Sequence, residues 1–359
     1  MKTGVIIANT GSPSSPDPDD IEAYLRDFLM DDRIRQLPKP LWKHLMFKRV
    51  LPKRKFTSAE HYRFIWTPEG SPLIAYQQRL ANKVQDAFNA EGRGESSDDA
   101  VVACSAMSYG DYTIDRALTD LRAQGCNRVV LLPLYPQSAY SPTQAVIDAY
   151  KRAIKSIGWN PPSCIIDNYH DNPLYLNAIA DRIRTAGYRP AAGDHLLFSF
   201  HAIPLKDERA GDTYRSQVAR STQLIAERLG IATTDITVAY QSVFGGNKSA
   251  WVSPLATDVL TTWRNEDSRV FFCCPGFSID CLETLYDVPH DMVPALEGET
   301  ALPVTSCAET GGDIQAACHT SGRFVWVPCL NDSNEHCALV HGVVSGALDE
   351  GRFEGGTAL

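Results

Sequence analysis

A histidine at the end of an apolar run is the first residue whose type and position suit chemistry. The run HLLFSFH covers residues 195–201 and ends in His201, with a proline three residues later. An imidazole can accept a proton or bind a metal ion near neutral pH, because its unperturbed pKa is about 6.5. The alternative is a histidine that only completes a core, and its position alone leaves both interpretations open.

Three carboxylates within residues 274–287 form the second candidate group. Asp280, Glu283 and Asp287 are spaced by three and four residues, which would place them on one face of a helix. The segment contains no Lys or Arg that could neutralise them. The pattern fits either a solvated acidic face or a path of oxygen ligands for a divalent metal ion or for protons.

Short apolar runs that alternate with amphipathic stretches would position these groups. The runs predict strands at residues 4–9, 100–107, 128–135, 164–167, 195–201, 236–242, 269–275 and 323–328, and stretches such as 71–90 and 213–230 predict helices. This alternation indicates βαβ units in an α/β protein whose parallel sheets are covered on both faces. Open α/β sheets bind ligands beyond the carboxyl ends of their strands, and His201 lies at one such end.

The pattern of strand ends occurs twice along the chain. Residues 4–13 and 196–204 each run from apolar to polar residues and then reach a proline. We therefore expect an internal duplication, with two similar Rossmann-like domains whose parallel sheets face a central cleft. The predicted domains are residues 1–190 and 191–345, with a join rich in turn residues and a flexible tail at 346–359.

Composition narrows the class of protein. The net charge of −9 over 359 residues argues against a general nucleic-acid binder, which needs a basic face. No stretch is long and apolar enough to span a membrane, and the first residues show no cleavage-site pattern. We expect a cytoplasmic protein; no feature of the sequence indicates its oligomeric state.

Six motifs, in order along nearly the whole chain, resemble the ferrochelatases, enzymes that insert Fe²⁺ into a porphyrin. The motifs are NTGSP, YLRDFLMDDR, PLYPQ, SFHAIP, CPGFSIDCLETL and PCLNDS. The resemblance implies two chelatase-type domains, a lyase of haem biosynthesis, Fe²⁺ as substrate and no cofactor required for catalysis. It also implies that His201 removes the pyrrole protons with Glu283 as its partner, and that both handle the metal together with Asp280 and Asp287.

The resemblance implies a porphyrin site as well. Its residues would be Thr10, Arg54, Ser71, Met107, Tyr135 and Trp251. Large apolar and aromatic side chains suit the flat ring, and Arg54 and Ser71 suit its propionates, although the wall residues could equally be plain core. Thr10 stands where the family usually has Leu, Met or Tyr, and YLRDFL favours protoporphyrin IX over coproporphyrin III.

A basic stretch at residues 37–55 suggests a further contact. It holds seven Lys or Arg and no acidic residue, interleaved with Leu, Trp, Met, Phe and Val. The pattern fits an ordinary solvated helix and loop, or a lip that grips an apolar ligand and rests on an anionic membrane. Because the family has an apolar lip near this position, peripheral membrane contact is our hypothesis.

The cysteines allow two interpretations. Ten are present without a Cys-x-x-Cys pair, and four of them lie close together in the sequence: Cys307, Cys318, Cys329 and Cys337. Some ferrochelatases hold a [2Fe–2S] cluster with four cysteines, but this spacing matches no known ligand signature. Free thiols are therefore the favoured prediction.

Two other functions stay open. One is a chelatase that inserts Co²⁺ or Ni²⁺ into a related tetrapyrrole, but such enzymes usually use paired histidines, whereas here only His201 ends a key strand. The other is a porphyrin or haem carrier without catalysis. Binding a flat ring needs neither a base nor an acid, so His201 and Glu283 argue against the carrier.

Overall fold

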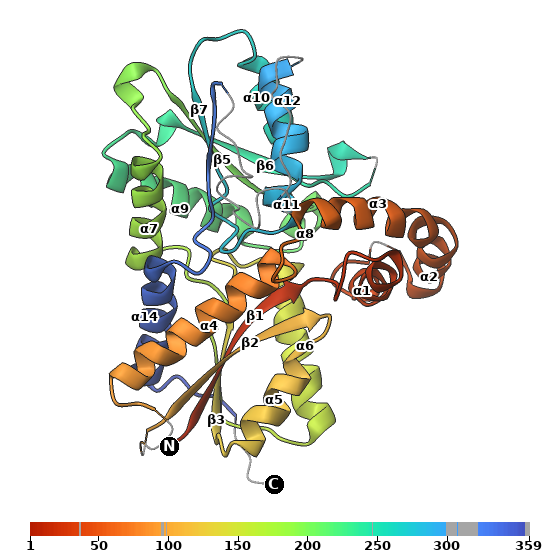
Figure 1. The fold of residues 1–359 in the computed structure, drawn as a ribbon, viewed down its shortest axis with the longest axis vertical. Coiled ribbons are helices and arrows are strands. Elements are labelled where there is room, and N and C mark those ends of the chain that lie inside the picture. Colours follow the sequence, from red (N-terminus) through yellow and green to blue (C-terminus); the bar gives the residue numbers. More distant parts are fainter. Residues whose placement is uncertain are drawn as a thin grey trace. The chain divides into compact units, whose positions relative to one another are not determined.

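Two four-stranded parallel sheets organise the chain in the computed structural model (Figure 1). The structure describes residues 1–35, 37–94, 97, 99–245, 247–298, 307 and 322–355. These residues belong to two compact units: Met1–Glu60 with Leu73–Tyr169 and Asp332–Leu359, and His61–Pro72 with His170–Asn331. The predicted α/β class with parallel sheets is confirmed.

The sheet of the first unit has the strand order β2-β1-β3-β4. Its strands are β1 (Thr3–Gly11), β2 (Val101–Tyr109), β3 (Arg128–Pro133) and β4 (Ser163–Ile165). Val5, Ile6 and Ile7 are completely buried along β1, because helices cover both faces of a parallel sheet. Each such side chain contributes about 1.5–3 kcal/mol through its burial.

Helices pack on both sides of this sheet (Figure 1). They are α4 (Pro72–Ala90), α5 (Ile114–Ala123), α6 (Pro142–Ile157) and α14 (Asn334–Glu350). Three further helices precede α4 in the chain: α1 (Pro18–Met30), α2 (Lys39–Leu45) and α3 (Leu51–Ile65). Apolar residues of α5 and α6 pack with Ile6 and Leu131 of the sheet. On α4, Gln77 donates a 2.9 Å hydrogen bond to the carbonyl of Ile7, which anchors this helix to β1.

The C-terminal segment belongs to the first unit rather than to the second, where residues 191–345 were expected. The imidazole of His341 on α14 lies 3.1 Å from the carboxylate of Glu91 and packs against the ring of Phe88. Beyond α14, Glu354 forms two backbone hydrogen bonds with Ser163 at the edge strand β4. Residues 346–355 are thus tied to the first sheet. A single helical pattern carries no sign of which sheet it will cover.

The second unit repeats the topology of the first, with the order β6-β5-β7-β8. Its strands are β5 (His195–His201), β6 (Ile236–Gln241), β7 (Val270–Cys273) and β8 (Phe324–Val327). Its helices are α7 (Pro173–Thr185), α8 (Leu205–Arg209), α9 (Tyr214–Leu229), α10 (Ala256–Thr262), α11 (Leu282–Leu285) and α12 (Val293–Glu297). The same order in both sheets is what an internal duplication would produce.

Candidate functional site

His201 is the last residue of β5, an inner strand of the second sheet. It pairs in register with Gln241, the last residue of β6, and the amide of Ala202 donates to the carbonyl of Gln241 at 2.8 Å. Nδ1 of His201 lies 2.7 Å from the carbonyl oxygen of Ala202. Because a carbonyl can only accept, Nδ1 carries a proton and donates it. Nε2 is then the basic nitrogen of the neutral ring, and no described residue hydrogen-bonds to it.

The acidic segment is not one helix, and the expectation that its three carboxylates share a helix face is wrong. α11 covers only Leu282–Leu285, so Asp280 precedes it, while Asp287 leads into a π-helical turn, η5 (Val288–Met292). The amide of Asp280 donates to Oδ1 of Asn331 at 2.8 Å rather than to a carbonyl of a preceding turn. A side chain from elsewhere in the unit thus replaces the helical pattern at this point.

Asp280 is enclosed by hydrogen-bond donors. Its side chain is completely buried, and its oxygens accept from Asn331 Nδ2 at 2.7 Å and from Thr284 Oγ1 at 2.8 Å. Burial raises the pKa of Asp280, while hydrogen bonds from Cys329, Asn331 and Thr284 favour its charged form. Both oxygens are therefore engaged with the protein, which suits a group that shapes the start of α11 better than one that exchanges a metal ion.

Asp287 has a different environment. Its Oδ2 accepts a 2.8 Å hydrogen bond from Ser242, the residue that follows β6. Burial, reinforced by the nearby carboxylate of Glu283, raises the pKa of Asp287 to about 7, and the bond from Ser242 opposes this rise. The side chain can therefore take up or release a proton near neutral pH.

Glu283 lies between these two carboxylates in the sequence and is only partly buried. Its Oε2 accepts a hydrogen bond from the thiol of Cys281, with the sulfur 3.0 Å away. Burial raises the pKa of Cys281 well above its ordinary value, so this thiol keeps its proton and remains a donor. The backbone carbonyl of Glu283 accepts a 2.8 Å hydrogen bond from Nε2 of Gln241, the residue paired with His201. Gln241 thus connects the strand end of His201 with Glu283.

In the first unit, Thr10 and Tyr135 are brought together. The two hydroxyls lie 2.6 Å apart, and the hydroxyl of Tyr135 donates to Oδ1 of Asn9 at 2.9 Å. Because Tyr135 has one hydroxyl proton, Thr10 must be the donor to Tyr135. Gly11, the last residue of β1, follows Thr10 with φ +116°, and a Cβ there would lie only 2.0 Å from a backbone oxygen of β2. Glycine is therefore needed to hold Thr10 at this strand end.

The other expected porphyrin contacts are distributed over both units. Met107 is almost fully buried and pairs in register with Asn9 at the same end of the first sheet. Arg54 lies partly buried on α3, and Ser71 is buried immediately before α4. Trp251 forms a short antiparallel bridge with Pro204, three residues after His201. The structure thus groups Met107 with the Thr10 and Tyr135 pair, and Trp251 with the chain that follows β5.

The four cysteines considered as possible cluster ligands do not form one described group. Cys307 and Cys329 are buried in the second unit, Cys337 lies on α14 in the first, and Cys318 lies outside the described residues. Burial raises the pKa of Cys329 well above its ordinary value, and the charge on Asp280 raises it further. Free thiols stay our prediction for these residues.

Sequence reasoning missed three residues that hold the candidate site: Gln241, Ser242 and Cys281. The only signal for the first two was that the run ITVAYQS turns polar at its end. Cys281 is next to Asp280, but its bond to Glu283 could not be deduced from spacing. Within the described ranges, no group of three or more His, Cys, Asp and Glu side chains is arranged to hold a metal ion.

Comparison with solved structures identifies the fold class of the protein. The structure of "SirB from Bacillus subtilis with Fe3+" superposes with a TM-score of 0.53 and 10% sequence identity, covering 99% of each chain. This similarity shows the fold alone: the protein has the chelatase fold, with a parallel sheet of the same strand order in each half.

Sequence comparison then gives the family. The ferrochelatase family model matches residues 2–300. Curated ferrochelatases from Nitrosococcus oceani, Vibrio cholerae and Aeromonas hydrophila are 35%, 33% and 37% identical to this chain, covering 93%, 96% and 94% of it and 84%, 97% and 96% of their own lengths. The chain belongs to the ferrochelatase family, and it is an enzyme that inserts iron into a porphyrin.

Proposed function

We propose that this protein inserts Fe²⁺ into protoporphyrin IX, with His201 as the base and Glu283 as its carboxylate partner. The observation that carries the assignment of the base is the 2.7 Å contact between Nδ1 of His201 and the carbonyl of Ala202. This contact fixes the tautomer and leaves the lone pair on Nε2. A base at the carboxyl end of a parallel strand is where an α/β protein places reacting groups.

The reaction sets a clear requirement for the base. Two pyrrole N–H protons must leave the ring as its nitrogens form bonds to Fe²⁺. Nε2 of His201 accepts each proton in turn and passes it on, while Nδ1–H keeps donating to Ala202. That second contact holds the ring in orientation and stabilises the imidazolium that forms after each transfer.

The acidic residues provide the route away from His201. Glu283 is partly exposed and keeps a donor thiol, Cys281, on its carboxylate. Next in the sequence of carboxylates is Asp287, whose pKa burial and Glu283 raise to about 7. A carboxyl group that titrates near neutral pH can both accept and release a proton. We assign Asp287 to this proton path and Asp280 to holding the start of α11.

Thr10 supports the choice of protoporphyrin IX. Its hydroxyl proton is committed to Tyr135, whose own proton is committed to Asn9. Thr10 therefore has no hydroxyl proton left for an additional carboxylate on the ring edge. Protoporphyrin IX carries two vinyl groups where coproporphyrin III carries two further propionates, so it makes no demand for such a donor.

The assignment can be tested by anaerobic turnover of Fe²⁺ with protoporphyrin IX and with coproporphyrin III, followed by loss of porphyrin fluorescence. We expect turnover on protoporphyrin IX that falls at least a hundredfold in His201→Ala and in Glu283→Ala. Faster turnover on coproporphyrin III would overturn the substrate assignment. Full activity of His201→Ala would overturn the base. Tight porphyrin binding without metal insertion would indicate a carrier.

The lip at residues 37–55 is the proposed membrane contact. Leu37, Leu41 and Leu45 follow one another at spacings of four and are 45%, 63% and 38% exposed, and Phe56 just beyond the lip is 55% exposed. Trp42 of α2 is buried, and its indole N–H donates to the carbonyl of Leu29 at 2.6 Å. Leu41 and Leu45 lie one turn apart on α2 and form an exposed apolar stripe there, and Leu37 lies just before the helix.

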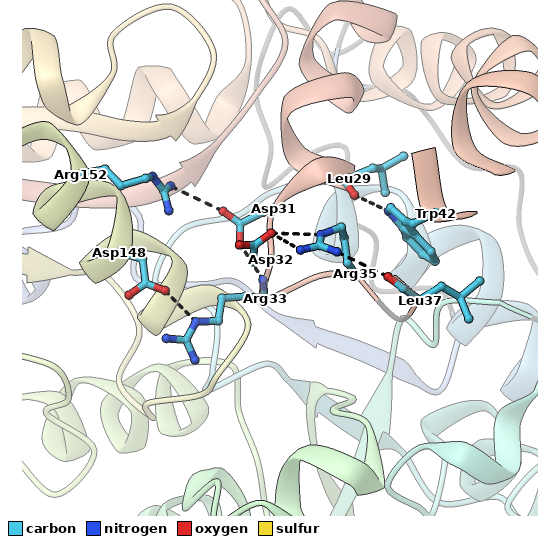
Figure 2. Close-up of polar contacts among 9 residues, drawn as sticks. All are labelled: Leu29, Asp31, Asp32, Arg33, Arg35, Leu37, Trp42, Asp148 and Arg152. Carbon is cyan, nitrogen blue, oxygen red and sulfur yellow. Dashed lines mark hydrogen bonds and ion pairs between the residues drawn. The ribbon is translucent and has the colours of Figure 1, made fainter. Parts of the chain in front are cut away.

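The base of the lip is fixed to the first sheet's helices. Figure 2 shows Arg33 reaching Asp148 and Arg152 reaching Asp31, with nitrogen–oxygen distances of 2.7 and 3.7 Å. Asp148 and Arg152 belong to α6, so the turn between α1 and α2 is tied to that helix. The exposed stripe is therefore presented from an anchored base. We propose that it enters the surface of an anionic membrane, because the lip carries seven basic and no acidic residues.

Vesicle flotation tests this contact. We expect the protein to float with phosphatidylglycerol vesicles and much less with phosphatidylcholine vesicles, and added salt should weaken the interaction. Leu41→Ser combined with Leu45→Ser should reduce flotation several-fold. Leu174→Ser is the matched control, because this leucine is 42% exposed on α7 in the second unit. Equal flotation with both lipids would overturn the proposal. No described helix is long and apolar enough to cross a membrane.

A further inference from the structure

Gln241 makes contacts that no step of the proposed reaction uses directly. It ends β6, its side chain is almost fully buried, and its amide contacts both the strand that carries His201 and the segment that carries Glu283. We propose that Gln241 is the positioning residue that fixes Glu283 relative to His201 for metal insertion. This inference rests on the proposed function.

The backbone of Gln241 positions His201. The two residues are partners in the parallel ladder between β5 and β6. The carbonyl of Gln241 then accepts the amide of Ala202 at 2.8 Å, one residue past His201. The same Ala202 receives the Nδ1–H bond of the imidazole through its carbonyl. Gln241 thus holds the peptide on which the orientation of the base depends.

The side chain of Gln241 positions Glu283. Nε2 donates to the carbonyl of Glu283 at 2.8 Å. Oε1 accepts from the hydroxyl of Ser199 on β5 at 2.5 Å. The Glu283 carbonyl can only accept, so the amide must present its NH₂ group there, and the Ser199 hydroxyl fixes the other end. A buried amide with both ends engaged has one orientation, which it imposes on the backbone of α11.

Neighbouring residues reinforce this arrangement. Ser242 directly follows Gln241 and holds Asp287 through its hydroxyl. Ser242 has φ +61°, a conformation that non-glycine residues rarely adopt. A residue stays in such an unfavourable backbone conformation only where the surrounding structure holds it there, and such residues are common at functional sites. Two consecutive residues at the end of β6 therefore hold two acidic residues of the candidate site.

The test is a comparison of kinetic constants in Gln241→Met. Methionine has a similar length and volume but cannot donate to Glu283 or accept from Ser199. If Gln241 positions Glu283, kcat for Fe²⁺ insertion falls tenfold or more, while the porphyrin KM and the porphyrin Kd from fluorescence quenching stay within twofold. A residue with only a structural role would lower thermal stability without this selective loss of kcat.

Gln85→Met is the matched control for lost stability. Gln85 lies on α4, and both ends of its amide are engaged as in Gln241: it donates to the carbonyl of Val101 at 3.0 Å and accepts from the amide of Ala103 at 2.7 Å. We expect it to lower Tm like Gln241→Met and to keep kcat. Ser199→Ala is a milder second variant, because it removes the hydroxyl that donates to Oε1 of Gln241 and leaves the contact of that oxygen with the thiol of Cys274 at 3.7 Å. It should lower kcat several-fold at unchanged porphyrin affinity.

The outcomes separate this inference from the proposed function. If the wild-type protein inserts iron, and Gln241→Met and Ser199→Ala have the same kcat as the wild type, the positioning role is overturned and the proposed function is not. An equal loss of kcat in Gln85→Met would also overturn it, because stability would then explain the effect. If the wild-type protein binds porphyrin without inserting iron, the proposed function fails, and the positioning role fails with it.

Discussion

Ser242 holds Asp287 by a 2.8 Å hydrogen bond, and it does so from a left-handed backbone conformation with φ +61°. The bond favours the charged form of a carboxyl whose pKa burial and Glu283 raise to about 7. The side chain is therefore held at a balance between burial, which favours its protonated form, and this single donor.

The first prediction concerns Asp287 and pH. The pKa of Asp287 is raised from 3.8 to about 7 in the folded protein, so the folded state binds more protons than the unfolded state between these values. The contribution of Asp287 to the free energy of unfolding is therefore fully present below about pH 4 and is lost as the pH rises to about 7. Asp287→Asn removes the titration and should raise the free energy of unfolding at pH 8 by about 4 kcal/mol, with little change at pH 4.

Denaturant unfolding at several pH values measures this difference. Asp267→Asn serves as the control, because Asp267 is exposed and its replacement should have little effect at either pH. The prediction would be contradicted if the difference in free energy of unfolding between Asp287→Asn and the wild-type protein were the same at pH 4 and at pH 8.

The second prediction separates strain from hydrogen bonding at Ser242. Ser242→Ala loses the hydroxyl and keeps a side chain at positive φ, whereas Ser242→Gly loses the hydroxyl and removes the strain. We expect Ser242→Gly to unfold with a free energy about 1 kcal/mol higher than Ser242→Ala. Equal stabilities in urea would show that the backbone here is not strained.

The third prediction concerns Thr10. Thr10→Val keeps the shape of the side chain and removes the donor to Tyr135. Tyr135 would keep its bond to Asn9 but lose its partner on the other side. We expect the KM for protoporphyrin IX to rise several-fold with a smaller change in kcat, since binding rather than proton transfer is affected.

The kinetics of Thr10→Val should be compared with those of Thr119→Val. Thr119 is exposed on α5, and its hydroxyl bonds only to a carbonyl of its own helix. Thr119→Val should leave both the KM for protoporphyrin IX and kcat unchanged. If Thr10→Val behaves like this control, Thr10 has no part in porphyrin binding.

The fourth prediction concerns the cysteines. The protein purified without oxygen should be colourless, contain no acid-labile sulfide, and show ten reactive thiols after denaturation, one for each cysteine. The reason is that the spacing of Cys307, Cys318, Cys329 and Cys337 matches no known ligand signature of a four-cysteine cluster. Iron and acid-labile sulfide that co-purify in equal amounts would contradict this expectation.

Much of the fold followed from local sequence patterns. Continuous apolar runs identified the strands, because strands of a parallel sheet are buried on both faces, and β5 has the bounds that its run predicted. The position of His201 at a strand end followed from the same pattern. These features depend on neighbouring residues, which a sequence displays directly.

The misjudged features depend on residues far apart in the chain. The helix expected at 280–287 is interrupted by Asn331, which lies fifty-one residues beyond Asp280 and binds its amide and its carboxylate. The link from Gln241 to Glu283 spans forty-two residues. Spacing within one segment carries no information about such partners, so the acidic segment was predicted as a plain helix.

The repeated strand order has a consequence for how the two halves came to differ. Thr10 lies three residues before Pro13 at the end of β1, and His201 lies three residues before Pro204 at the end of β5, so they occupy equivalent places in the two sheets. One half has a threonine that contacts a tyrosine at this place, and the other has an imidazole. The function that we propose gives these two equivalent positions different tasks, substrate recognition at Thr10 and proton removal at His201.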